Sequence, residues 1–281
     1  MVNALTIDVE DYFHVTAFEQ YVKPEEWECY PSRVVDNTLR VLDILDETSK
    51  KATFFVLGWV AERNPSLVRT IQERGHDIAS HGYAHELVYR IGPVRFRDDI
   101  RRAKRLIEDV TGKEVTGYRA PSYSITKKSL WAYDILLEEG FSYDSSVFPI
   151  LHDIYGIPDA QRFPYDVKRP SGTMKEFPLS TIQLRLSGLE YRVPIAGGGY
   201  LRLFPTGLIK RAIQHINHTE QQPAVLYFHP WEIDPKQPRI AASFKSRFRH
   251  YLNLDKTADK VRCLLRQFDF GPMKDILYAQ R

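Results

Sequence analysis

Short apolar, β-branched runs alternate with longer amphipathic segments from residue 2 to about residue 147. This alternation is typical of parallel strands joined by crossover helices, so it predicts an α/β fold. Strands are expected at Val2–Val9, Ala52–Leu57, Asp77–Ser80, Val115–Arg119 and Phe141–Ser145, with a late strand at Ala224–Phe228.

Helices are expected between these strands. In the segment 33–47, Val35, Leu39, Leu42 and Leu45 fall on one stripe at helical period, which indicates a face that packs on the core. Further helices are expected from Asn64-Pro65 to Gly75, from Val94 to Val110 before Gly112, and from Thr126 to Gly140, because these residues are typical helix ends.

The alternation breaks between about Phe148 and Tyr200, where short segments are rich in Pro, Gly and aromatic residues, including Ile195-Ala196-Gly197-Gly198-Gly199. We expect residues 148–200 to form an insertion of short strands that could cover a site. The main domain is expected at 1–235. Residues 236–281 should form an extended stretch and a helix packed outside it.

Composition narrows the class of protein. A chain of 281 residues fits one barrel-sized domain, and a net charge of +3 with balanced acids and bases does not indicate a nucleic-acid partner. Cys29 and Cys263 are too few for a disulfide framework, which favours a reducing compartment.

The sequence also bears on location. Neither a signal peptide at the N-terminus nor a long apolar stretch is recognisable, which predicts a cytoplasmic protein. The basic stretch Ser243–Arg266 fits a solvated helix face; the alternative is peripheral contact with the inner membrane or a biosynthetic complex.

Ionisable residues follow the predicted strands. Asp8-Val9-Glu10-Asp11 ends the first strand, and His81 and His85, four residues apart, follow the third. Carboxyl ends of parallel strands share one edge, where two imidazoles and a carboxylate suit a divalent metal. Separately, an acidic helix start and a chance pair of histidines would explain these residues equally well.

Three more segments add to this set. Arg119-Ala120-Pro121-Ser122 offers a guanidinium for a carboxylate and a backbone amide near Ser122 for an oxyanion. His229 and Trp231 follow the late strand, and Asp144 ends another. A salt bridge and a buried structural histidine would explain these singly, but the conjunction at five strand ends favours a catalytic site.

The order of these motifs closely resembles that of polysaccharide deacetylases with a NodB-homology domain, carbohydrate esterase family 4. The resemblance covers roughly residues 2–232. The matching segments are Thr6-Ile7-Asp8, His81 with His85, Arg119-Ala120-Pro121, Asp144 and Leu226-Tyr227-Phe228-His229. The family's second aspartate falls on Val9, so Glu10 or Asp11 must replace it as a metal ligand.

The resemblance implies a distorted (β/α) barrel of about seven strands. Within the family, segments such as Asp8–His14, Gly197–Arg202 and Phe228–Pro235 resemble deacetylases from exopolysaccharide gene clusters associated with exosortase sorting. The likeness continues into the tail at Arg247–Tyr251 and Phe270–Met273. This branch lies near peptidoglycan deacetylases and a metal-free allantoinase-like enzyme.

The resemblance also implies roles for the site residues. A divalent metal, expected to be zinc although cobalt or nickel would suit the same ligands, would be held by His81, His85 and Glu10 or Asp11. Asp8 would act as the base, oriented by Arg119.

His229 would be the acid, kept charged by Asp144 or a neighbour. Ser122 would supply the oxyanion amide, and Leu226 and Trp231 would form the pocket for the acetyl methyl group.

The predicted function is therefore removal of N-acetyl groups from an amino-sugar polysaccharide, or its lipid-linked precursor, in exopolysaccharide biosynthesis. Two alternatives remain open. A metal-independent amidohydrolase acting on a small cyclic amide would follow if Val9 signals a lost ligand. A non-catalytic carbohydrate-binding protein on the same scaffold would need no acid, base and arginine set.

Overall fold

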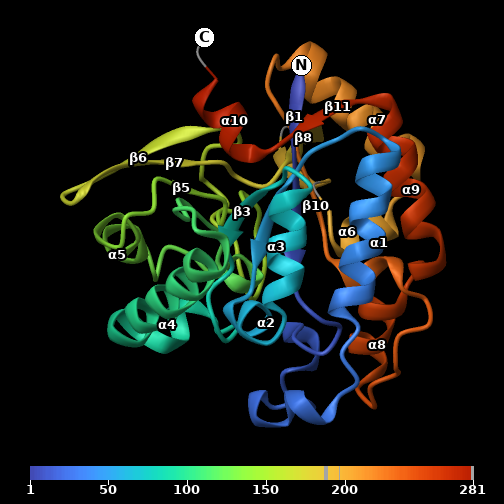
Figure 1. Ribbon diagram of the computed structural model, residues 1–281. Helices are drawn as coiled ribbons and strands as arrows, with labels where there is room; N and C mark the ends of the chain where they lie inside the picture. Colours follow the sequence, from blue (N-terminus) through green and yellow to red (C-terminus); the bar gives the residue numbers. More distant parts are fainter. Residues whose placement is uncertain (187–188, 196, 280–281) are drawn as a thin grey trace.

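A curved, mainly parallel sheet wrapped by helices forms the centre of the molecule (Figure 1). The computed structural model describes residues 1–186, 189–195 and 197–279. Among these residues, seven strands run parallel in the order β10-β1-β2-β3-β4-β5-β7. They are β1 Val2–Val9, β2 Thr53–Val56, β3 Asp77–Ser80, β4 Gly117–Tyr118, β5 Tyr143–Asp144, β7 Gly172–Glu176 and β10 Val225–Phe228.

Other strands extend this sheet or stand apart from it. The strand β6 (Tyr165–Arg169) pairs antiparallel with β7, and β11 (Asp269–Gly271) pairs with the start of β1. The strands β8 (Thr181–Leu186) and β9 (Leu189–Pro194) form a separate hairpin. Part of the predicted insertion at 148–200 therefore belongs to the main sheet, while its residues 187–188 and 196 lie outside the described residues.

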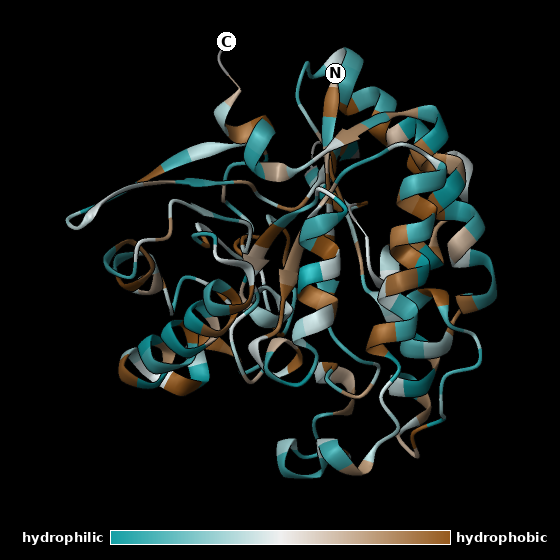
Figure 2. Ribbon diagram, in the orientation of Figure 1, coloured by the Kyte–Doolittle hydropathy of each residue, from teal (hydrophilic) through white to brown (hydrophobic). Residues whose placement is uncertain are grey.

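Helices cover the outside of the sheet, and many of them alternate between hydrophobic and hydrophilic residues around their circumference (Figure 2). This pattern lets each helix bury one side on the strands. The helices are α1 Val34–Glu47, α2 Gly58–Arg63, α3 Pro65–Glu73, α4 Val88–Thr111, α5 Ala132–Glu138, α6 Gly199–Leu203, α7 Thr206–Gln214, α8 Phe244–Tyr251, α9 Leu254–Gln267 and α10 Met273–Tyr278.

Side chains of β1 alternate between two cores, as the period of a strand requires. Leu5, Ile7 and Val9 pack outward, in the core shared with the helices. Ala4 packs inward against a smaller cluster that includes Phe55, Ala79 and Tyr227. Since Asp8 has the parity of Ala4, it lies on the inner side, where it is buried.

Irregular segments bridge the gap between the β5 side of the sheet and β10. The amide of Leu179 donates to the carbonyl of Val147, and that of Ile195 donates to Ser180. Gly197 forms a parallel bridge with Tyr227 of β10. The structure thus confirms the predicted α/β fold with about seven parallel strands. The contacts of these irregular segments connect the two sides of the sheet, as in a distorted barrel.

Most predicted elements are confirmed, with shifted boundaries. The predicted helix at 94–110 is longer, because α4 begins at Val88 and kinks at Gly92, which has a φ of 73°. The prediction that Thr126 caps a helix was wrong: it opens a turn closed by Ser129, and α5 begins only at Ala132. Helix α2 was not predicted, since Gly58–Arg63 is too short to show a period.

The last 45 or so described residues return to the main sheet rather than packing only on its outside. Strand β11 pairs with β1, and α9 lies beside α1 (Figure 1), where Arg262 forms an ion pair of 2.9 Å with Glu47. Among the described residues, no helix is both long enough and apolar enough to cross a membrane. The division into a main domain at 1–235 and an extension stays a prediction.

We expect Gly197→Ala to destabilise the protein strongly, because the new Cβ would lie 1.8 Å from the carbonyl oxygen of Tyr227 and would break the bridge to β10. The free energy of unfolding, measured by urea denaturation, should fall by about 2–3 kcal/mol or more. The control is Gly207→Ala in α7, where a Cβ meets no atom within 4 Å. Equal stabilities of the two variants would contradict this account of the bridge.

Candidate active site

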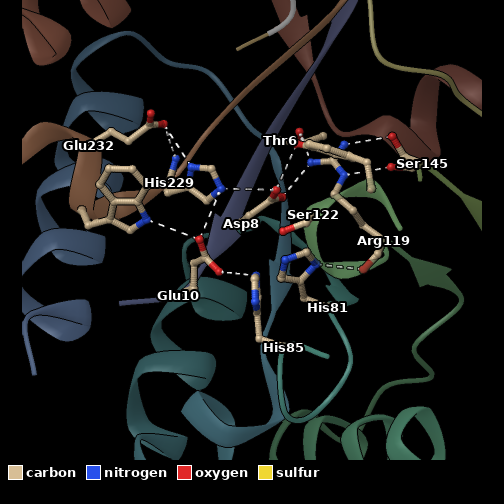
Figure 3. A network of polar contacts seen from close by, with 12 residues as sticks. Thr6, Asp8, Glu10, His81, His85, Arg119, Ser122, Ser145, His229 and Glu232 are labelled. Atoms are coloured by element: carbon tan, nitrogen blue, oxygen red, sulfur yellow. Dashed lines mark hydrogen bonds and ion pairs between the residues drawn. The ribbon is translucent and has the colours of Figure 1, made fainter. Parts of the chain in front are cut away.

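Most of the predicted site residues meet at the carboxyl ends of β1, β3, β4 and β10 (Figure 3). This edge is where parallel α/β folds expose functional side chains. A cavity of about 530 Å³ opens there, a size typical of small-ligand sites. Its deep lining includes Asp8, Glu10, His81, His85, His229 and Trp231.

Asp8 and Arg119 form a fully buried ion pair, as predicted. Nη1 of Arg119 donates to Oδ1 of Asp8 at 2.7 Å and to the hydroxyl of Thr6 at 2.8 Å. Its Nε and Nη2 donate to the carbonyl and the hydroxyl of Ser145. The second carboxylate oxygen of Asp8 accepts a longer hydrogen bond of 3.4 Å from Tyr123. The carboxylate is therefore fixed through one oxygen and presents the other to the cavity.

Glu10, His81 and His85 form a cluster suited to a metal ion. One potential ligand atom from each residue lies within 4.8 Å of the other two. Glu10 has the strand parity of Asp8 and so points inward, whereas Val9 packs in the outer core. Glu10 is thus the inward carboxylate next to Val9, the position on which the resemblance places the family's second aspartate.

Electrostatics in this cluster favour ligation. Burial lowers the pKa of His81 to about 4, although Asp8 opposes this, so the ring is neutral at physiological pH. Its Nδ1 lies 2.8 Å from the carbonyl of Arg119, which fixes the proton there and leaves Nε2 a lone pair. Burial raises the pKa of Glu10, but His85 and His229 outweigh it and hold that pKa below its usual range.

Asp11, the other candidate ligand, faces away from the cavity, and this prediction was wrong. Its Oδ2 accepts hydrogen bonds from the hydroxyl of Ser32 and from the amides of Arg33 and Val34, at 2.7–3.0 Å. These amides are at the start of α1 and have no partner within the helix. Asp11 therefore anchors α1 to the end of β1.

His229 is held by Glu232 rather than by Asp144. Its Nδ1 lies 3.1 Å from Oε2 of Glu232, and its Nε2 lies 3.4 Å from Glu10 and 3.9 Å from Asp8. Burial lowers the pKa of His229, but Glu10 and Glu232 together raise it to about 9. The imidazole is thus protonated at physiological pH and has Nε2 directed at the two carboxylates.

Asp144 has a structural role, so its predicted contact with His229 was wrong. Its carboxylate accepts hydrogen bonds of 2.6 and 3.1 Å from the hydroxyl and amide of Ser146. It is buried beside Glu176, whose pKa is raised well above the ordinary value by burial and by the charge of Asp144. A protonated Glu176 can then hydrogen-bond to Asp144, which holds β5 to β7.

Of the predicted substrate contacts, Trp231 and Ser122 line the cavity and Leu226 does not. Leu226 packs in the outer core, and its neighbour Tyr227 lines the cavity instead, because adjacent strand residues face opposite sides. The indole of Trp231 stacks on His229, with ring centroids 5.2 Å apart.

Ser122 has a left-handed φ of 50°, and its hydroxyl lies 2.5 Å from that of Thr16. The following amide, that of Tyr123, donates to the carbonyl of Ala120, so it is already used. Of the predicted amides near Ser122, that of Tyr123 is therefore not free to bind an oxyanion.

Glu232 and Arg202 also belong to the site, although the sequence did not identify them as site residues. Glu232 lies three residues after His229, and its carboxylate accepts a 2.9 Å hydrogen bond from the backbone amide of His229. This contact caps the start of a short 3₁₀ helix, Pro230–Ile233. Nε of Arg202 donates to Oε1 of Glu232 at 2.6 Å, and both side chains are buried. The spacing of a capping box, with Pro230 first and Glu232 third, was the signal that could have identified Glu232.

Two family comparisons cover different parts of the chain. The polysaccharide deacetylase family matches residues 27–136, and a domain of unknown function (DUF3473) matches residues 145–278. The first match includes His81, His85 and Arg119, and the second includes His229, Glu232 and Arg202.

Individual relatives agree with the first match. A peptidoglycan deacetylase-like protein of Gibberella zeae is 34% identical over 145 residues, 50% of this chain and 41% of its own. A peptidoglycan deacetylase of Helicobacter pylori is 32% identical over 108 residues, covering 38% of this chain and 36% of its own. This chain thus spans about two fifths of the length of these relatives.

Among solved structures, the crystal structure of an allantoinase is similar with a TM-score of 0.58 at 14% identity, covering 98% of this chain and 88% of that chain. At this identity the likeness shows the fold alone.

The two candidate carboxylate ligands can be separated by substitution. We expect Glu10→Gln to weaken binding of Zn²⁺ or Co²⁺ at least tenfold, because an anionic ligand is lost from the cluster. Asp11→Asn should leave that affinity nearly unchanged but lower the free energy of unfolding by about 1–3 kcal/mol, because buried helix amides lose a charged acceptor. Competition titration with a chelating dye and urea denaturation measure both quantities. Loss of metal affinity in Asp11→Asn alone would reverse the assignment.

Proposed function

We propose, because this chain contains a polysaccharide deacetylase domain of the NodB type, that it hydrolyses N-acetyl groups on an amino-sugar polysaccharide. The observation that carries the proposal is the placement of a fixed carboxylate, Asp8, and a protonated imidazole, His229, beside one Glu-His-His cluster in one cavity. A deacetylation needs a base for water, an acid for the leaving amine and an electrophile for the carbonyl.

The residues of the cluster fit a divalent metal. Glu10, His81 and His85 offer one oxygen and two nitrogens, a set typical of catalytic zinc sites, with cobalt or nickel as substitutes. Oε2 of Glu10 is buried and lies 2.8 Å from Nε2 of His85, so these two potential ligand atoms already converge on one point. When bound, the ion would supply Lewis-acid polarisation of the acetyl carbonyl and of water.

Asp8 is the proposed general base. Arg119 binds its Oδ1, which leaves Oδ2 on the cavity side to take a proton from the attacking water. Because Arg119 also bonds Thr6 and Ser145, the carboxylate cannot rotate away from this orientation. Fixing a catalytic group in this way lowers the entropic cost of reaching the transition state.

His229 is the proposed general acid. Glu232 binds its Nδ1, so the proton to be donated to the departing sugar amine lies on Nε2, which points into the cavity. Arg202 in turn holds Glu232, and Trp231 stacks on the imidazole ring. The acid is therefore oriented from two sides, and Glu232 takes the place that the resemblance gave to Asp144.

The metal-independent alternative rests on Val9. That residue packs in the outer core and Glu10 occupies the inward position, so a carboxylate is still supplied to the two histidines. The likeness to an allantoinase carries the fold alone. The binding-protein alternative has no specific observation in its favour, since binding needs no buried base held by an arginine.

The biological setting is part of the proposal. The motifs Gly197–Arg202 and Phe228–Pro235 resemble those of deacetylases in exopolysaccharide clusters, which supports a role in exopolysaccharide biosynthesis, in the cytoplasm or at the inner membrane. The proposed substrate is the polymer itself or its lipid-linked precursor.

Acetate release from N-acetylated chitooligosaccharides tests the activity. We expect release that a chelator abolishes and zinc or cobalt restores, and we expect Asp8→Asn to lower kcat by about two to four orders of magnitude. Asp109→Asn, an exposed aspartate on α4, is the control. Chelator-resistant release would favour the metal-independent reading. Binding of sugar without any release would favour the binding protein.

The pH dependence tests the role of Glu232. His229 must be protonated to act as the acid, so kcat/KM should fall as pH rises through its pKa, which Glu232 raises. Glu232→Gln removes a negative charge that raises this pKa, so the alkaline limb should move to lower pH. This contribution persists when Glu10 binds a cation, because Glu232 lies outside the cluster. Circular dichroism checks folding, and an unmoved limb would refute the assignment.

A further inference from the structure

The outer wall of the cavity comes from the C-terminal part of the chain. Helix α8 contributes Lys245, Phe248 and Arg249, and Leu252 follows directly after it. These positions follow the spacing i, i+3, i+4 and i+7, so they form one helix face that is directed at the cavity. The neighbouring Arg247 does not line the cavity.

This wall is rigidly connected to the catalytic residues. His250 is buried, and its ring stacks on Trp231 with centroids 4.1 Å apart and an interplanar angle of 12°. Its Nε2 lies 2.7 Å from Oε1 of Gln237, and its carbonyl accepts a 2.6 Å hydrogen bond from Arg202. The position of α8 is therefore set by the same residues that hold Glu232 and His229.

Lys245 and Arg249 have no ion-pair partner in the part of the chain that the structure describes. Both side chains belong to exposed residues, and among the described residues neither lies within 4.0 Å of a carboxylate. In contrast, Arg262 on the next helix, α9, pairs with Glu47. Two like charges one helical turn apart repel each other, so the pair is unfavourable unless an anion lies between them.

Two stacked aromatic residues line the same cavity as these cations. His152 and Tyr155 stack with centroids 3.8 Å apart, and Tyr155 stacks in turn on Phe148. Burial lowers the pKa of His152, and Asp153, 3.0 Å from its Nδ1, opposes this. His152 and Tyr155 line the cavity together with Lys245 and Arg249, and aromatic rings offer flat faces of the kind on which sugar rings pack.

We propose that Lys245 and Arg249 form a subsite for a carboxylate or phosphate group carried by the saccharide next to the N-acetylated sugar. The substrate class is then an acidic amino-sugar polymer or a phosphorylated oligosaccharide, and this inference rests on the proposed deacetylase function. The two cations attract an anion to the α8 side of the cavity, which orients the ligand in it. Arg249 can bind either group bidentately.

The alternative ligand for these cations is an anionic membrane surface. Phe244 and Phe248 on α8 are exposed and stacked on each other, as in helices that lie on lipid. However, Lys245, Phe248 and Arg249 line the same cavity as Asp8 and His229, and a flat bilayer cannot reach into it. We therefore favour a saccharide anion and treat the membrane as an outcome of the test.

The experiment compares three probes: chitotetraose, which is neutral, a hyaluronan tetrasaccharide, which carries carboxylates, and chitobiose 1-phosphate. Calorimetry measures the affinity of each for the full chain, and acetate release is followed in parallel. Lys245→Gln/Arg249→Gln is the test variant and Arg247→Gln on the same helix is the control. Binding is independent of turnover, so failure of the subsite and failure of the proposed activity are distinguished.

We expect at least one acidic probe to bind more tightly than chitotetraose and to lose affinity about fivefold for each cation removed, as for exposed ion pairs. Any turnover effect should appear in KM rather than kcat, since the contact lies away from the reacting bond. Added salt should reduce the difference in affinity between the acidic probes and chitotetraose. A loss of affinity for the hyaluronan tetrasaccharide would indicate a carboxylate subsite, and a loss for chitobiose 1-phosphate would indicate a phosphate subsite.

Equal affinity of all probes, or equal loss in the control variant, would overturn the subsite. So would unchanged affinities in the double variant combined with lost cosedimentation on phosphatidylglycerol vesicles, which would assign the two cations to a membrane surface instead.

Discussion

The buried guanidinium of Arg119 is the constraint around which the rest of the molecule is arranged. A charged group without access to water costs several kcal/mol unless its donors are satisfied. Its four hydrogen bonds reach Asp8 and Thr6 on β1 and Ser145 after β5, while Arg119 itself follows β4. One side chain therefore ties together three segments of the sheet at the edge that forms the cavity. Any shift in the register of these strands would leave a buried charge unpaired.

Arg202 repeats this principle on the opposite side of the cavity. It is buried, pairs with Glu232, and donates to the carbonyl of His250. The proposed base, Asp8, is thus oriented by Arg119, and the proposed acid, His229, by Glu232, which Arg202 holds. The two arginines belong to different family matches. Arg119 falls within the region matched by the deacetylase family, whereas Arg202 and His250 fall within the domain of unknown function. The second domain match therefore completes the site begun by the first.

The sequence predicted those features that depend on strand parity and strand ends. Asp8, His81 and Arg119 follow recognisable apolar runs, so their meeting at one edge could be predicted. Asp11 was misassigned because adjacent carboxylates differ only in direction, which is decided by the position of α1. Leu226 could have been placed correctly from parity alone. Asp144 was misassigned because its partner Glu176 comes from β7, whose pairing with β5 no local pattern reveals.

The position of β1 in the sheet has a consequence for synthesis on the ribosome. This strand pairs with β2 on one side and with β10 and β11 on the other. Its outer partners are translated more than two hundred residues later, as the 220-residue separation of Thr6 and Leu226 illustrates. Until then a hydrophobic edge stays open, and such edges invite aggregation. The nascent chain therefore carries Asp8 on a strand whose outer edge has no partner until β10 has been made.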